Sequence, residues 1–195
     1  MKNFTELEKM RHSTAHLLAA AVVELFPDTK LGIGPVIEDG FYYDFDFKEP
    51  VSESDLGKIE KRMSELKTKK LWYKRTEMGV EEAIKFNQKL QQPYKKELCA
   101  DLKKAGEKKV SFYEIGDFVD LCEGPHLKNT ADIGVFKLTS IAGAYWRGSE
   151  KNAMLTRIYG TAWPTKQDLD DYLSRLEEAK KRDHRVLGKE LGLFV

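Results

Sequence analysis

The length, composition and charge of this 195-residue chain are those of an ordinary globular protein, with 41% apolar and 33% charged residues. They exclude a membrane-spanning helix, because the longest apolar run, residues 17–23, is far shorter than the roughly 20 residues that a bilayer requires. They also exclude a general attraction to polyanions, because 33 basic and 32 acidic residues leave a net charge of only +1. A polyanion can bind only to local basic segments, and the candidates are residues 67–70, 94–97 and 180–185. Basic segments of this kind are more often solvated helix surfaces than binding sites.

The N-terminal residues and the cysteines indicate a reducing compartment. The stretch MKNFTELEKM has no apolar core of the kind that a signal peptide needs, so we expect a cytoplasmic protein without membrane contact. In that compartment Cys99 and Cys122 remain reduced, because cytosolic disulfides are rare. Cys122 is therefore available for chemistry.

Helical periodicity dominates the first part of the chain. Apolar residues recur at helical spacing over 4–26, with Thr5 as the N-cap and Pro27 ending the helix. His12 and His16 lie on this helix. Three shorter helices are expected further on, from Ser54 to Leu66, over 80–90, and over 93–105 between Pro93 and Gly106.

Two strand signals accompany these helices. Residues 31–47, LGIGPVIEDGFYYDFDF, contain two apolar runs joined by Asp39-Gly40, a pair typical of tight β-hairpins, and they place Tyr43 on the second strand. From residue 109 the pattern alternates with period two. It predicts an antiparallel meander of strands over 109–116, 117–122, 133–140, 142–148 and 152–163.

A long, polar helix is expected from Thr165 onward, because Leu169, Tyr172 and Leu176 form a single apolar stripe. Helices and strands are therefore segregated along the chain rather than alternating. This arrangement predicts an α+β fold, with a mostly antiparallel sheet, helices packed on it, and a long C-terminal linker helix. We expect residues 1–163 to form one domain and 164–195 to form the linker.

Two short motifs hold three of the chain's four histidines and one of its two cysteines. HSTAH, residues 12–16, places His12 and His16 four residues apart, so both side chains share one face of the helix, about 5–6 Å apart. CEGPH, residues 122–126, places Cys122 and His126 in a loop, because Gly-Pro interrupts a helix. Either motif alone can be merely structural. Together they indicate a single site.

Three chemistries suit these residues, and the residues themselves leave the choice open. A tetrahedral zinc ion accepts three histidines and one cysteine. A metal-free hydrolase can use imidazole to orient and deprotonate water, and a Cys–His nucleophile needs a thiolate beside an imidazole. A metalloprotease of the H-E-x-x-H type is excluded, because Ser13 stands where that motif has its general-base glutamate.

Six separated motifs, in this order, closely resemble the editing domain of bacterial-type threonyl-tRNA synthetases, to which alanyl-tRNA synthetase editing domains are related. The resemblance runs from about Arg11 to Leu191. The motifs are HSTAH, GIGPVIEDGFYYDFD, DLCEGPH, AGAYWRG, RIYGTAW and RLEEAKKRDHRVLGKEL.

The resemblance implies an aminoacyl-tRNA ester hydrolase that deacylates mischarged seryl-tRNA(Thr), with the serine-bearing 3′-acceptor end of tRNA(Thr) as its partner. Residue by residue, it assigns the core editing positions to His12, His16, Cys122 and His126, and pocket positions to Tyr43, Lys95 and Asp120. It leads us to expect that His12 and Lys95 position or activate the water. The other residues then shape the serine pocket.

The resemblance implies that no cofactor is needed for this reaction. Alanyl-type relatives hold zinc with the same residue types, so zinc stays an option, with His12, His16, Cys122 and His126 as its ligands. The alternative function is a zinc-stabilised RNA-binding module without catalysis, in which Tyr145 and Trp146 contact RNA.

A whole synthetase of this family also has an N-terminal ubiquitin-like domain, a class II catalytic core and an anticodon-binding domain. We therefore expect either an excised fragment or a free-standing trans-editing protein, without ligase activity of its own. The final residues KELGLFV, where the catalytic core would begin, favour the fragment. In this interpretation 1–163 is the editing domain and 164–195 is a helical linker toward an absent core, which would be the rest of the synthetase chain.

Overall fold

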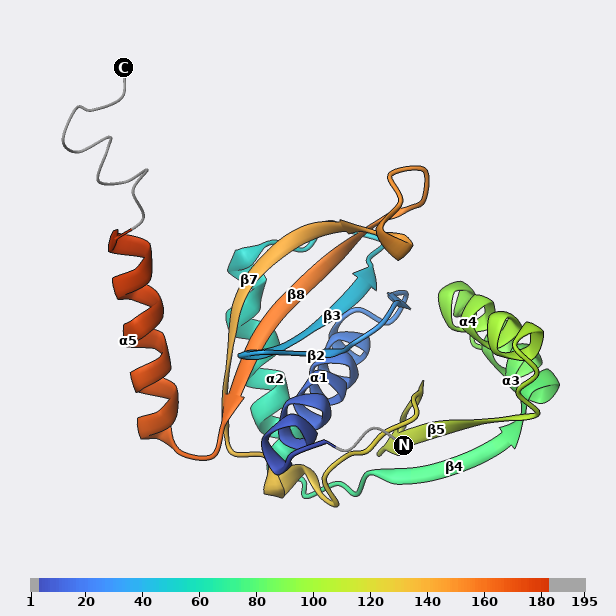
Figure 1. Cartoon of the computed structure of the whole chain (residues 1–195), viewed down its shortest axis with the longest axis horizontal. Helices are drawn as coiled ribbons and strands as arrows, with labels where there is room; N and C mark the ends of the chain where they lie inside the picture. Colours follow the sequence, from blue (N-terminus) through green and yellow to red (C-terminus); the bar gives the residue numbers. More distant parts are fainter. Residues whose placement is uncertain (1–3, 183–195) are drawn as a thin grey trace.

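Two antiparallel sheets flank the first helix in the computed structural model, which describes residues 4–182 (Figure 1). The helices are α1 (Glu6–Leu25), α2 (Leu56–Thr68), α3 (Val80–Lys89), α4 (Pro93–Lys104) and α5 (Lys166–Arg182). The strands are β1 (Lys30–Leu31), β2 (Val36–Ile37), β3 (Gly40–Asp46), β4 (Lys74–Gly79), β5 (Lys109–Ile115), β6 (Phe118–Leu121), β7 (Val135–Tyr145) and β8 (Met154–Trp163). This combination confirms the predicted α+β class.

Helix α1 is the central element of the fold, and its predicted ends are confirmed. Thr5 caps it through a reciprocal pair of bonds with Glu8, and the helix ends just before Phe26 and Pro27. Every residue from Arg11 to Val22 is buried. The helix is covered all round because it packs on α2, on β3 and β8 of one sheet, and on β6 of the other.

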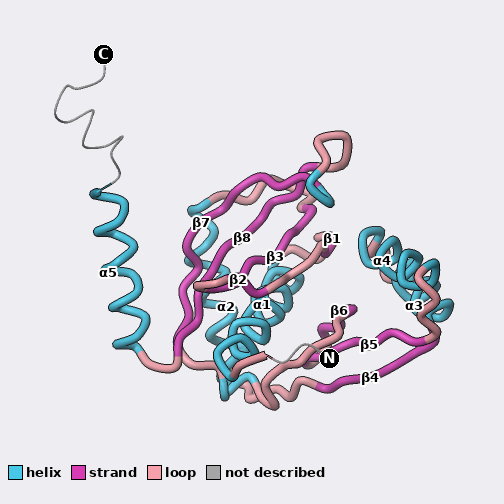
Figure 2. The backbone as a smooth tube through the Cα atoms, in the orientation of Figure 1, coloured by secondary structure: helices cyan, strands magenta, loops and turns pink. Residues whose placement is uncertain are grey.

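The strands form two sheets rather than the single meander that the sequence predicts (Figure 2). The larger sheet has the order β1-β3-β8-β7, with β2 paired to β3, and the smaller has the order β4-β5-β6. All pairings are antiparallel. The prediction was wrong because the first hairpin pairs with β8, from the far end of the chain, and this separates β5 and β6 from β7 and β8.

Two local predictions also need correction. The hairpin exists, but its turn is Glu38-Asp39, and Gly40 is already paired with Ile37. A glycine is required at position 40 because a Cβ atom there would lie 2.2 Å from the carbonyl oxygen of Gly160. The strands predicted over 133–140 and 142–148 are one strand, β7, with a bulge between Leu138 and Ser140, followed by a 3-10 turn.

The sequence pattern missed two short strands, β1 and β4. Strand β4 reads KRTEMG and, within residues 4–182, pairs with β5 alone, at the edge of the smaller sheet. An exposed edge strand needs no alternating apolar residues, so it leaves no periodic signal. The predicted helices are confirmed within a few residues, with Pro93 opening α4 and Gly106 following its end at a positive φ of 92°.

Helix α5 packs along β7 and β8. Thr165 caps its start, because the Thr165 hydroxyl accepts from the backbone N–H of Asp168 and the Asp168 carboxylate accepts from the backbone N–H of Thr165. Of its predicted apolar stripe, Leu169 is buried, whereas the residues that follow it are partly or fully exposed. Residues 183–195 of the predicted linker lie outside the described residues. None of the helices within residues 4–182 is long and apolar enough to cross a membrane.

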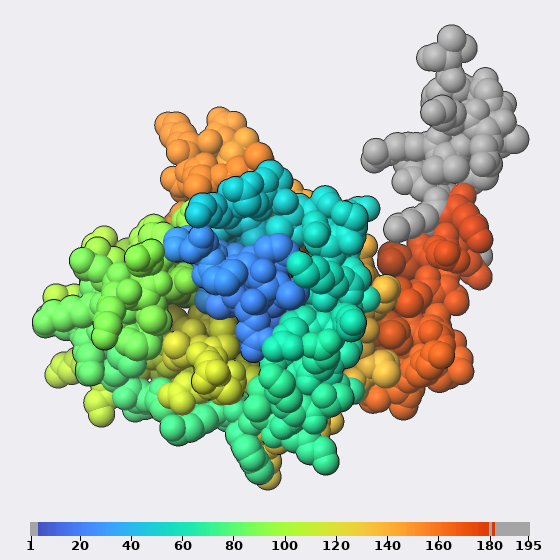
Figure 3. Space-filling model, turned by 180° about the vertical axis from the view of Figure 1, so that it is seen from behind, coloured from blue at the N-terminus to red at the C-terminus, as the bar shows by residue number. Residues whose placement is uncertain are grey.

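The α3–α4 hairpin stands beside the end of α1, on the side opposite α2 (Figure 3). It packs on the smaller sheet through Val80, Ala83 and Cys99, which share a core with Val110 and Phe112. Helix α4 also meets β1 of the larger sheet. It therefore reaches both sheets and brings Lys95 against Asp120 of β6.

Candidate functional site

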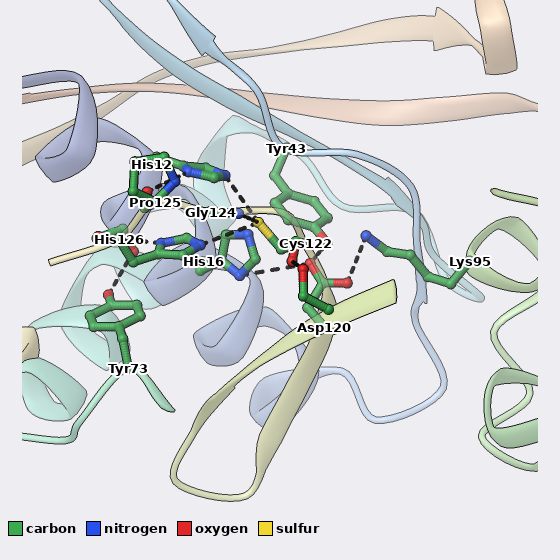
Figure 4. A network of polar contacts seen from close by, with 12 residues as sticks. His12, His16, Tyr43, Tyr73, Lys95, Asp120, Cys122, Gly124, Pro125 and His126 are labelled. Carbon is green, nitrogen blue, oxygen red and sulfur yellow. Dashed lines mark hydrogen bonds and ion pairs between the residues drawn. The ribbon is translucent and has the colours of Figure 1, made fainter. Parts of the chain in front are cut away.

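The two histidine and cysteine motifs meet at one place, between α1 and the loop that follows β6 (Figure 4). His12 and His16 project from α1 with their ring centroids 5.2 Å apart. The ring of His126 stacks on that of His12 at 4.1 Å and meets that of His16 edge-on at 4.4 Å. The prediction of a single cluster from HSTAH and CEGPH is confirmed as a spatial arrangement.

Cys122 connects two of the imidazoles. Its Sγ lies 3.4 Å from Nε2 of His12 and 3.3 Å from Nε2 of His126, and the backbone N–H of Gly124 donates to it at 3.3 Å. His12 Nδ1 lies 3.0 Å from the carbonyl oxygen of Pro125. A carbonyl only accepts, so a neutral His12 carries its hydrogen on Nδ1 and presents a lone pair on Nε2.

A second polar group, from three different elements, adjoins the cluster. Asp120 on β6 accepts a hydrogen bond of 2.5 Å from the Tyr43 hydroxyl and pairs with Lys95 at 2.6 Å. His16 Nδ1 lies 3.8 Å from the same carboxylate and has no hydrogen-bond partner among the described residues. Lys95 and Asp120 are each only 3% exposed, so the pair is buried. The structure thus brings Tyr43, Lys95 and Asp120 beside the four core residues.

A cleft of about 570 Å³ opens onto this group. Its polar lining includes His12, His16, Lys95, Asp120 and Cys122, and its other wall is the segment from Ile33 to Glu38. Tyr43 and His126 stand behind this lining rather than in it. A neighbouring cavity of about 630 Å³ shares Cys122 but is lined by none of the three histidines within residues 4–182, which places the candidate chemistry in the first cleft.

Burial sets the protonation of these side chains. It lowers the pKa of His16 and of His126 well below the usual value, with the neighbouring His12 adding to both shifts, so both imidazoles are neutral. Burial raises the pKa of the Cys122 thiol to about 12. A nucleophilic cysteine needs a thiolate, so this environment disfavours the Cys–His nucleophile.

The residues of the cluster fit a zinc ion. One ligand atom from each of His12, His16, Cys122 and His126 lies within 4.8 Å of the others. Ligand atoms in a tetrahedral zinc site are roughly 3.3–3.6 Å apart, which is close to the two distances from the Cys122 sulfur. Zinc there would polarise a carbonyl or a water molecule.

Two residues of the site were not found from the sequence. The hydroxyl of Tyr73 donates to the carbonyl oxygen of Ser13 at 2.7 Å, and its ring stacks on His126. Ser13 Oγ contacts His126 Nδ1 at 3.3 Å. Ser13 was visible within HSTAH as the position that excludes a protease, whereas Tyr73 has no local signal.

The aromatic residues and basic segments that were predicted to contact RNA differ in how far they are exposed. Trp146 is buried and donates to Glu97, whereas Tyr145 is half exposed. In segment 94–97, Tyr94 and Lys95 are buried, so this segment is not a basic surface. Lys69 and Lys70 of segment 67–70 are exposed, and segment 180–185 lies largely outside the described residues.

Comparisons with known proteins show which family and which proteins this chain is similar to. Residues 110–159, which include the second motif, match the family described as the threonyl and alanyl tRNA synthetase second additional domain. The chain is 57% identical to a threonine–tRNA ligase of Acetivibrio thermocellus over 94% of its own length, and 55% identical to one of Hahella chejuensis over 96%. It spans 29% of the length of each of these relatives.

Proposed function

We propose an editing hydrolase, on the premise that this chain belongs to the family of threonyl and alanyl tRNA synthetase second additional domains. The substrate is seryl-tRNA(Thr), which this domain deacylates within, or alongside, a larger synthetase. The observation that carries the proposal is the cleft in which His12 and the buried Lys95–Asp120 pair line one polar wall.

The reaction is hydrolysis of the ester between serine and the terminal ribose. His12 Nε2 accepts a proton from water as the water oxygen attacks the ester carbonyl, and that proton then passes to the departing ribose oxygen. The Lys95 side chain, held by Asp120 at 2.6 Å, orients the water or the carbonyl oxygen. Neutral His16 serves as a hydrogen-bonding group toward the serine amine or hydroxyl.

Selectivity for serine over threonine rests on exclusion. An apolar pocket distinguishes one methyl group by only about 1–3 kcal/mol through attraction, so threonine must clash with the cleft wall. Cys122 is half-buried and forms part of that wall. The extra methyl of threonine then displaces either the ester carbonyl or the water from the line of attack, and small displacements cost large rate factors.

We expect the wild-type chain to hydrolyse seryl-tRNA(Thr) much faster than threonyl-tRNA(Thr). Cys122→Ala should enlarge the pocket and accelerate threonyl-tRNA(Thr) hydrolysis more than seryl-tRNA(Thr) hydrolysis. Deacylation of the two labelled esters under single-turnover conditions measures both rates. Equal enzyme-dependent rates with the wild-type chain would contradict the proposed selectivity.

The second candidate function is a zinc-stabilised RNA-binding module without catalysis. The observation that favours it is the set of four ligand atoms within 4.8 Å. The same deacylation assay separates the two functions. A folded chain that binds tRNA but does not accelerate hydrolysis of the seryl-tRNA(Thr) ester would support the RNA-binding module.

We expect hydrolysis to proceed without a bound metal. The support is geometric: Asp120 is the acidic residue beside the cluster, and its carboxylate is engaged by Tyr43 and Lys95 rather than hydrogen-bonded to a ligating imidazole. Protein purified without a metal-affinity tag or chelator should contain zinc well below stoichiometry and should keep its kcat in EDTA. One zinc per chain, with activity lost on chelation, would overturn this expectation.

A further inference from the structure

Arg11 is a buried cation that neither proposed function uses. It is only 3% exposed, and it forms no ion pair with a carboxylate among residues 4–182. Its Nη1 donates to the carbonyl oxygen of Glu38 at 2.5 Å, its Nε donates to that of Ala162 at 3.5 Å, and its guanidinium carbon lies 4.7 Å from the ring centre of Trp163. Burying a charge without a counter-ion is costly unless hydrogen bonds satisfy it, so these contacts hold the side chain in place.

The bond to Glu38 ties one wall of the cleft to the helix that carries the histidines. Arg11 precedes His12 on α1, whereas Glu38 ends the segment from Ile33 to Glu38 that forms the other wall. A guanidinium has only donors and stays charged, so the direction of this bond is fixed. Arg11 does not itself line the cleft. Any effect on a bound substrate therefore passes through the wall.

The two ends of this wall are held in different ways. Strand β3 holds the first part, through backbone hydrogen bonds to the carbonyl oxygens of Ile33 and Pro35. The last part is the turn Glu38-Asp39, and side chains hold its carbonyl groups. Arg11 donates to the first of them, and Thr161 Oγ1 donates to the second at 2.6 Å. Loss of the Arg11 side chain should therefore loosen the end of the wall and leave its beginning in place.

We propose that Arg11 is a positioning residue that fixes the cleft wall relative to α1, and that the preference for serine depends on it. This role rests on the proposed hydrolase function, in which threonine is excluded by a clash with the cleft. A clash excludes a substrate only where the wall cannot yield, because a shift of about 1 Å changes the line of attack and the room for a methyl group. The planar guanidinium resists such a shift, since its donors bond two separate segments while its face lies on Trp163.

The direct test is amide hydrogen exchange, which needs no substrate. In Arg11→Met, amides within residues 33–40 should exchange roughly tenfold faster than in the wild-type chain, because the turn opens more often, while the buried amides from Leu17 to Val22 keep their protection. Arg11→Lys keeps the buried charge, so it should fold even where Arg11→Met does not, and its single ammonium should restore only part of the protection. Unchanged exchange over 33–40 in Arg11→Met, or in Arg11→Lys where only that variant folds, overturns the proposal.

The selectivity test compares single-turnover rates for seryl-tRNA(Thr) and threonyl-tRNA(Thr). In Arg11→Met the preference for serine should fall by roughly tenfold or more, because small displacements in a site cost large rate factors. Lys67→Met is the matched control. Lys67 is also a partly buried cation that donates to a backbone carbonyl, that of Gly134 at 2.6 Å, but neither of these residues lines the cleft. Its loss should lower the melting temperature and leave the preference for serine unchanged.

The two measurements distinguish failure of this role from failure of the hydrolase. A wild-type chain that hydrolyses neither ester rejects the hydrolase, and exchange over residues 33–40 then decides whether Arg11 fixes the wall. A wild-type chain that prefers serine, together with a folded Arg11→Met protein that keeps the same preference, rejects the role of Arg11 alone.

Discussion

Replacing His12 with asparagine is expected to lower kcat for seryl-tRNA(Thr) hydrolysis by roughly 10²–10⁴-fold, the range that a positioned general base contributes. The asparagine amide can replace Nδ1 as the donor to the carbonyl of Pro125, a bond of 3.0 Å in the wild-type chain. It offers no basic nitrogen in place of Nε2. The melting temperature should therefore change little while the single-turnover rate of deacylation falls.

Leu17→Ala is the matched control for this variant. Leu17 lies on the same helix and is completely buried, so truncation opens a cavity and should cost about 2–5 kcal/mol of the free energy of unfolding. The remaining folded protein should keep its kcat, because Leu17 does not line the cleft. A His12→Asn protein that melts earlier yet keeps the wild-type kcat would show that the histidine is structural.

The second large effect is expected from Asp120→Asn, which should lower the free energy of unfolding by roughly 3–5 kcal/mol. The change leaves the charged Lys95 side chain buried without its carboxylate, and weakens the bond that Tyr43 donates. Urea denaturation measures the loss. The cost is high because little water reaches the charge on a side chain that is only 3% exposed.

Two further variants show whether the buried charge of Lys95 causes the loss of stability in Asp120→Asn. Asp28→Asn breaks an exposed ion pair with Lys48 and should have little effect on stability, since surface pairs contribute little. Adding Lys95→Met to Asp120→Asn should recover part of the lost stability, because the unpaired charge is then removed. If Asp120→Asn is no more destabilising than Asp28→Asn, the buried pair does not stabilise the fold.

The sequence by itself determined the local parts of this protein. Thr5 and Pro27 mark the ends of α1, and four-residue spacing places His12 and His16 on one face, because both depend only on the geometry of a single helix. Gly124-Pro125 likewise determined that Cys122 and His126 lie in a loop. The proximity of the two motifs was inferred from their shared chemistry and from the family resemblance, rather than from periodicity.

Only the tertiary structure decided how distant segments complete the site. Lys95 comes from α4, Asp120 from β6 and Tyr43 from β3, and their periodicity indicates no more than ordinary helix and strand positions. The contacts of Ser13 with Leu127 and His126 could not be foreseen, although Ser13 lies within HSTAH. Spacing along the chain predicts which side chains share a face of one element. Which faces then pack together depends on pairings such as that of β3 with β8, between segments more than a hundred residues apart.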